Sequence, residues 1–78
     1  MDIQFSLWPL GDEHLKDDMQ VVTDVLEKHG LEYKMNQMST TLSGDWEAAM
    51  KCIKECHEAL RKTHKRVLCQ ITIDDDQA

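Results

Sequence analysis

The sequence lacks the features of membrane-spanning, secreted and disulfide-bonded proteins. No apolar run approaches the ~20 residues of a membrane-spanning helix, so we expect a soluble chain that does not bind membranes. The first residues lack a basic segment, a long apolar segment and a cleavage site of small residues, so no secretory signal is predicted and we expect a cytoplasmic protein. Three cysteines cannot form a closed set of disulfides within one chain, which favours free thiols in a reducing compartment.

Positive charge and aromatic rings are also scarce. Lys and Arg number 9 against 15 Asp and Glu, for a formal net charge of -6, and aromatic residues make up 5% of the chain. A protein that binds nucleic acid needs a basic surface, and one that binds RNA also needs rings on which bases stack. The composition therefore argues against a nucleic-acid partner.

What is present is enough for one small folded domain. The hydrophobic fraction, 41%, is too high for a disordered acidic tail. The length, 78 residues, leaves no room for a second domain, so we predict a single ligand-binding domain over residues 1–78. A domain of this size buries only about 60–65% of the surface of its unfolded chain and usually needs a ligand, a metal or self-association. We expect self-association.

Hydrophobic periodicity predicts six elements. Apolar residues alternate with polar ones in three segments, and a fourth segment, Thr40–Ser43, is predicted as a short strand. Apolar residues recur every three or four positions in two segments, which indicates amphipathic helices. The predicted strands are 3–8, closed by Pro9, then 31–35, 40–43 and 66–73. The predicted helices are one that begins at Leu15 and has Gly30 as its C-terminal cap, and one from Trp46 to about His64 with a turn and an N-cap in residues 43–45.

This order, strand-helix-strand-strand-helix-strand, is typical of an α+β ferredoxin-like sandwich, in which two helices cover one face of a four-stranded antiparallel sheet. No element is left to cover the other face of the sheet. That face is predicted to carry Gln4, Ser6, Trp8, Leu68, Gln70 and Thr72. A bare face with a tryptophan indicates a surface for binding or association.

The loops do not match the enzymes and carriers that share this strand order. The loop after the first strand, residues 9–13, contains two acids and no arginine, so an acylphosphatase phosphate cradle is excluded, and it lacks the cysteine pair of a heavy-metal carrier. Cys52 and Cys56 lie four residues apart on the second helix, but both are interpreted as core residues rather than metal ligands. The four histidines are interpreted as surface residues. Trp46 is interpreted as a core anchor, and the methionines as residues that fill the core. We therefore predict no catalytic residues and no metal.

What remains is a small-molecule site near the turns. Trp8 can present a ring face, while Ser6, Thr40, Thr41 and Ser43 can supply short hydroxyl groups. The acidic surroundings favour a cation. This combination suits a small, planar, positively charged or hydrogen-bonding ligand rather than bond breaking.

The motifs also resemble those of the small thiamine-binding protein family. Ser6-Leu7-Trp8-Pro9-Leu10-Gly11 is similar to the first-strand motif of that family, which usually has Tyr in place of Trp8. The stretch from Met38 to Asp45 is similar to its second motif, and residues 65–74 resemble its final strand. The resemblance implies a non-catalytic protein that binds thiamine or its hydroxymethylpyrimidine portion, as a dimer or tetramer, with Ser6, Trp8, Thr40 and Thr41 as ligand-binding residues.

The chain departs from the motifs of that family at four positions. The usual glycine is Ser39, the usual acid is Ser43, and the usual basic positions are Thr72 and Asp76. Because recognition depends on such polar partners, an alternative stays open, in which the pocket has decayed and the chain is an oligomeric assembly domain or a regulatory ligand-sensing domain.

Overall fold

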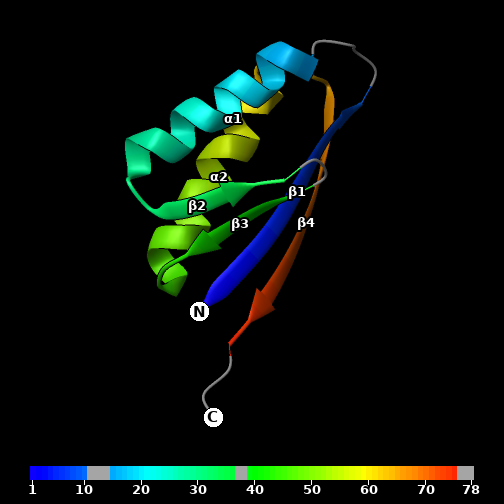
Figure 1. Cartoon of the computed structure of the whole chain (residues 1–78). Coiled ribbons are helices and arrows are strands. Elements are labelled where there is room, and N and C mark those ends of the chain that lie inside the picture. The colour runs from blue at the N-terminus through cyan, green and yellow to red at the C-terminus, as the bar shows by residue number, and fades with distance from the viewer. Residues whose placement is uncertain (11–14, 37–38, 76–78) are drawn as a thin grey trace.

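The computed structural model describes residues 1–10, 15–36 and 39–75, and its elements follow the predicted order (Figure 1). The elements are β1 (Asp2–Leu10), α1 (Leu15–His29), β2 (Glu32–Met35), β3 (Thr40–Ser43), α2 (Trp46–Arg61) and β4 (Arg66–Asp74). Among the described residues, no helix is long and apolar enough to cross a membrane.

The four strands form one antiparallel sheet in the order β2-β3-β1-β4, and both helices lie on the same side of it (Figure 1). The α+β ferredoxin-like sandwich is therefore confirmed. β1 pairs with β4 along its whole length but with β3 only over Asp2–Phe5. β2 and β4 are the two edge strands.

The core lies between the sheet and the helices. From the sheet, Ile3 and Phe5 on β1 and Leu42 on β3 are buried, as alternation of side chains along a half-buried strand requires. The helices contribute the other buried apolar side chains, Val22, Leu26, Ala49, Cys52, Ile53, Cys56 and Leu60. The cysteines of α2 are thus core residues, as the sequence indicated.

Two helix ends also follow the sequence signals. Asp45 is the N-cap of α2, and its Oδ1 accepts a hydrogen bond of 2.8 Å from the backbone N–H of Ala48. Gly30 follows α1 with a φ of +68°, a left-handed conformation that a residue with a Cβ rarely adopts. The predicted C-terminal cap of the first helix is confirmed.

The prediction that Pro9 closes the first strand is wrong, because β1 continues to Leu10. Pro9 is opposite Val67 of β4, but the pairing of β1 with β3 has already ended at Phe5. Beyond Phe5, β1 therefore has a neighbouring strand on one side only among the described residues, and a strand with one unpaired side is where proline is tolerated in a sheet.

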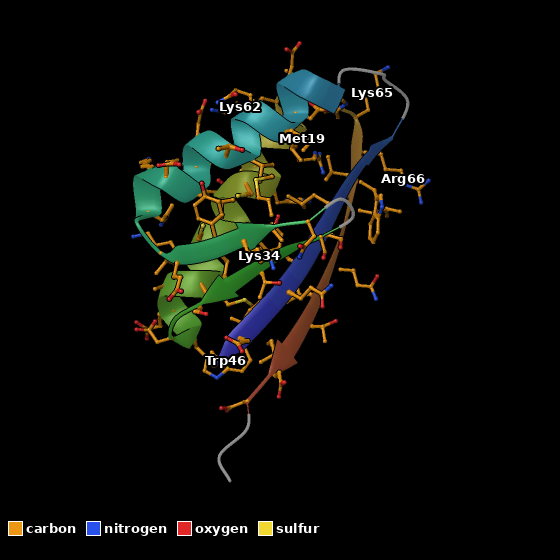
Figure 2. All side chains as sticks on the ribbon, viewed as in Figure 1. Met19, Lys34, Trp46, Lys62, Lys65 and Arg66 are labelled. Atoms are coloured by element: carbon orange, nitrogen blue, oxygen red, sulfur yellow. The ribbon has the colours of Figure 1, made fainter. Side chains whose placement is uncertain are left out.

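Met19 and Trp46 were predicted as core residues and are exposed, at 46% and 51% of their surface (Figure 2). In α1 the buried line runs through Asp18, Val22 and Leu26 at intervals of four, so Met19 lies about 100° around the helix from it. Trp46 is the first residue of α2. The first buried residue of α2 is Ala49, so Trp46 precedes the part of the helix that packs in the core.

The interpretation of all four histidines as surface residues is wrong for His64, which is 5% exposed. Its Nε2 lies 2.8 Å from Oδ1 of Asp18, also buried, at the start of α1. The pair joins two segments 46 positions apart and fixes the turn before β4 against α1. No periodic pattern in the sequence indicates such a contact.

Candidate functional site

The face of the sheet turned away from the helices, here called the open face, is the candidate site. Residues paired across antiparallel strands share a face, so the partners of the buried Ile3 and Phe5 define the helix side, and the residues between them define the open face. Its members are Asp2, Gln4, Ser6 and Trp8 on β1, Thr41 and Ser43 on β3, Glu32 and Lys34 on β2, and Arg66, Leu68, Gln70, Thr72 and Asp74 on β4.

The structure brings three of the four predicted ligand-binding residues to this face. Ser6, Trp8 and Thr41 lie on the open face. Thr40 lies on the other face, opposite Phe5 and Met35, and is only 6% exposed. The strand alternates its side chains, so adjacent threonines cannot line the same face, and Thr40 packs in the core.

Trp8 lies at one end of the open face beside another exposed apolar residue. Trp8 is 38% exposed and pairs across the sheet with Leu68, which is 44% exposed. Thr41 pairs with Gln4, four residues before Trp8, which puts Thr41 about 13 Å along the strand from the tryptophan. Ser6, with Gln70 opposite it, lies between the two.

The middle of the open face is polar, and hydrogen bonds between side chains order part of it. Gln4 donates from Nε2 to Oγ of Ser39 over 2.9 Å, and Ser43 donates from Oγ to Oδ1 of Asp2 over 3.0 Å. Asp2 therefore places a carboxylate directly beside Ser43, where the resembling motif has its acid.

Charge is distributed unevenly along the open face. Asp2, Asp74 and Glu32 lie in one row at the end of the face where β1 begins. Arg66 lies at the opposite end, beyond Trp8 and Leu68, at the outer edge of the sheet (Figure 2). The parity of the two long strands predicts these positions, although the sequence analysis did not single them out.

The thiols on the helix side of the sheet are poor nucleophiles. Burial raises the pKa of Cys56 to about 12, and it raises the pKa of Cys52 and Cys69 as well. A protonated thiol does not attack an electrophile. Among the described residues, no group of three or more His, Cys, Asp or Glu side chains is placed to hold a metal ion.

A shallow groove of about 470 Å³ lies elsewhere, between α1 and α2. Glu55 lines it and lies 3.5 Å from Nζ of Lys28 and 3.3 Å from Nε2 of His29. Contact with His29, and secondarily the charge of Lys28, lowers the pKa of Glu55. Glu55 is thus paired with two basic side chains, and none of the predicted ligand-binding residues lines this groove.

The fold and the open face together define a ferredoxin-like domain with one uncovered sheet face that carries a polar centre and an exposed tryptophan. Residues 3–78 match the family described as thiamine-binding protein, and the chain belongs to this family.

Two proteins of known structure are similar to this chain. The UPF0045 protein MJ1052 of Methanocaldococcus jannaschii is 29% identical over 73 residues, which cover 92% of this chain and 73% of that protein. Its crystal structure matches with a TM-score of 0.89 at 27% identity, over 97% of this chain and 79% of that one. A Thermotoga maritima protein, TM0486, named for thiamine biosynthesis/salvage, has the same fold, with a TM-score of 0.78 at 23% identity over 97% and 85% of the two chains.

Proposed function

We propose that this chain is a cytoplasmic, non-catalytic protein that binds thiamine, or its hydroxymethylpyrimidine portion, on the open face. The observation that carries the proposal is the exposed ring of Trp8 on a polar, uncovered sheet face, in a chain that belongs to the thiamine-binding protein family. The name of the Thermotoga maritima neighbour supports the same ligand class.

The aminopyrimidine ring stacks on Trp8 in this proposal, and its polar edge meets Ser6 and Gln70. Thr41 is about 13 Å from Trp8 along the strand, so a single pyrimidine ring cannot contact both. The two-ring thiamine molecule extends further along the strand, and the net charge of -6 on the chain favours its cationic thiazolium. Thiamine is therefore expected to bind more tightly than hydroxymethylpyrimidine.

The hydrogen bond between Ser43 and Asp2 favours a site that has been altered rather than lost. The family motif usually has an acid at position 43, and this chain has a carboxylate one strand away, 3.0 Å from the Ser43 hydroxyl. Asp2→Asn removes that charge while keeping the shape of the side chain. Asp2 is six residues before Trp8 on β1, about 20 Å along the strand and beyond the screening length of about 8 Å at physiological salt. A ligand stacked on Trp8 should therefore bind this variant almost unchanged, whereas a cationic ligand seated beside Ser43 should bind it more weakly.

Calorimetric titration with thiamine and with hydroxymethylpyrimidine tests the proposal, with tryptophan fluorescence recorded in parallel. Trp8→Phe and Trp46→Phe are a matched pair, because both rings are exposed but Trp46 lies at the start of α2 and not on the open face. Quenching should persist in Trp46→Phe and disappear in Trp8→Phe. Neither heat nor quenching at millimolar ligand contradicts the proposal.

A second candidate function is self-association, as a dimer or tetramer, with the pocket decayed. It is favoured by exposed apolar side chains on β4, among them Leu68 at 44% and Ile71 at 37%. It predicts a stable oligomer by light scattering whose melting temperature does not respond to either compound. A melting temperature that rises with thiamine contradicts the decayed pocket.

A further inference from the structure

Positive charge is concentrated where α2 ends and β4 begins. Four of the nine Lys and Arg residues of the chain lie in residues 61–66, here called the basic turn, and they are Arg61, Lys62, Lys65 and Arg66. No Asp or Glu occurs in residues 59–73. All four cations are exposed, and none of them forms an ion pair with another described residue. A chain with a net charge of -6 therefore carries unpaired positive charge at one end.

The end of the helix explains only part of this charge. Arg61 is the last residue of α2 and Lys62 is its C-cap, positions at which a cation stabilises the negative end of the helix dipole. Lys65 and Arg66 lie beyond the helix, and Figure 2 shows both at the end of the molecule where β4 begins. Their charge is available to an external anion.

The backbone of the basic turn is held in place by contacts with the rest of the fold. The N–H groups of Thr63 and His64 both donate to the carbonyl of Leu60, over 3.2 and 3.1 Å. The buried His64 side chain contacts Asp18 of α1 at 2.8 Å. A cation on an ordered backbone loses less conformational entropy when it binds an anion, so this turn is a prepared position for one.

Arg66 is also the cation closest in the register to the ring that is proposed to hold the pyrimidine. Trp8 pairs with Leu68, and Arg66 lies two residues before Leu68 on the same face of the sheet. Diagonal neighbours of this kind have Cβ atoms about 7–8 Å apart, within reach of long side chains. The carboxylate of Asp2 lies about 20 Å from Trp8 along the strand. A substituent on a ring stacked on Trp8 therefore meets positive rather than negative charge.

We propose that Arg66 binds a phosphate group carried by the ligand, so that the open face accepts the phosphate ester of hydroxymethylpyrimidine in preference to the free alcohol. A guanidinium group donates two parallel hydrogen bonds to a phosphate, and Lys65 adds a second positive charge nearby. The inference rests on the proposed function, because it requires the pyrimidine to stack on Trp8.

The chemistry of the ligand fits this position. The alcohol of hydroxymethylpyrimidine is one carbon from the ring, so its phosphate ester places a charge of about -1.5 to -2 close to the stacked ring at pH 7. In thiamine phosphate the phosphate is attached to the thiazolium, on the far side of the second ring. Local charges decide such contacts, because charges beyond about 8 Å are screened at physiological salt, and the net charge of -6 does not oppose them strongly.

Calorimetric titration of the full chain with hydroxymethylpyrimidine and with its phosphate ester tests the inference. The ester should bind about tenfold more tightly than the alcohol, and the difference should shrink as salt is added. In Arg66→Gln the preference for the ester should disappear, while the affinity for the alcohol stays the same. Arg66 is exposed, so this variant should melt at the same temperature as the unaltered chain.

Lys51→Gln is the matched control. Lys51 is exposed on α2, on the other side of the sheet from Trp8, and its replacement changes the net charge by the same amount. This control should keep the preference for the ester. Thiamine and thiamine phosphate form a second pair of ligands, for which a smaller difference is expected.

Loss of the preference in Arg66→Gln but not in Lys51→Gln supports the inference. An ester that binds no more tightly than the alcohol overturns it and leaves the proposed function standing, as does equal loss in the two variants. Inorganic phosphate that binds as tightly as the ester also overturns it, because the ring on Trp8 would then contribute nothing. If neither the alcohol nor thiamine nor either ester binds, the proposed function fails as well.

Discussion

β1 and β4 are neighbouring strands of nine residues each, paired with each other from end to end, yet they differ sharply in burial. Ile3 and Phe5 on the helix side of β1 are 0% and 2% exposed. Ile71, directly opposite Phe5 on the same side of the sheet, is 37% exposed. Both strands alternate apolar and polar residues, so the difference comes from their positions: β1 is central, and β4 is an edge strand that the helices cover only in part. Val67 and Ile73 of β4 pack against the core, whereas Ile71 between them is exposed. An apolar pattern shows which face of a strand is meant to be covered, and the covering surface can belong to another chain.

The largest expected effect comes from truncating the same residue type on the two strands. Ile3→Ala should lower the free energy of unfolding by about 2–5 kcal/mol, because it leaves a cavity in the packed core. Ile71→Ala should lower it by roughly 1 kcal/mol in dilute protein, because more than a third of that residue is already in water. Urea unfolding of both variants measures the difference. Equal losses would mean that β4 is as deeply packed as β1.

His64 is expected to give the next largest effect, since it is the deeply buried residue just before β4. His64→Ala should lower the free energy of unfolding by about 2–3 kcal/mol, because the buried Asp18 loses its partner at 2.8 Å. Lys54→Ala, which breaks an exposed contact of 3.9 Å with Glu58, is the control and should have almost no effect. If the two variants unfold alike, the polar pair does not anchor the start of β4.

The last comparison concerns the reactivity of the thiols rather than the stability of the fold. At pH 8 a thiol with a pKa of about 12, such as Cys56, is thiolate in only about one molecule in 10⁴, and it is buried. Cys69 on β4 is exposed and should react with iodoacetamide at least about a hundredfold faster in the native protein. Because the pKa values are raised, alkylation should speed up as the pH rises. Mass spectrometry of the labelled peptides locates the reaction, and early labelling of Cys56 would contradict its burial.

Much of the fold could be predicted from the sequence because periodicity reports which side of each element is apolar. The strand Thr40–Ser43, the cap at Gly30 and the open-face positions of Gln4, Ser6 and Trp8 were all predicted and agree with the structure. The end of β1 was not predicted correctly. Proline is excluded from a strand where its N–H would have to bond to a neighbouring strand, and the sequence does not show where the pairing of β1 with β3 stops.

The candidate site was only partly predictable for a similar reason. Thr40 and Thr41 look equivalent as hydroxyl donors, and only the register with β1 separates a buried Thr40 from an open-face Thr41. The contact of Ser43 with Asp2 joins residues 41 positions apart, and that of His64 with Asp18 joins residues 46 apart. Pairs at such separations follow from how strands and helices are placed together, which no local pattern records.

The sequence by itself determined the order of the elements, the face of each that is apolar, the ferredoxin-like class and the family motifs, because these depend on the spacing of side chains along the backbone. The tertiary structure decided which apolar residues are covered, since coverage depends on strand order and on the reach of the helices. It therefore buried Asp18 and His64, exposed Trp46 and Met19, and placed the nine residues of β4 at an edge of the sheet.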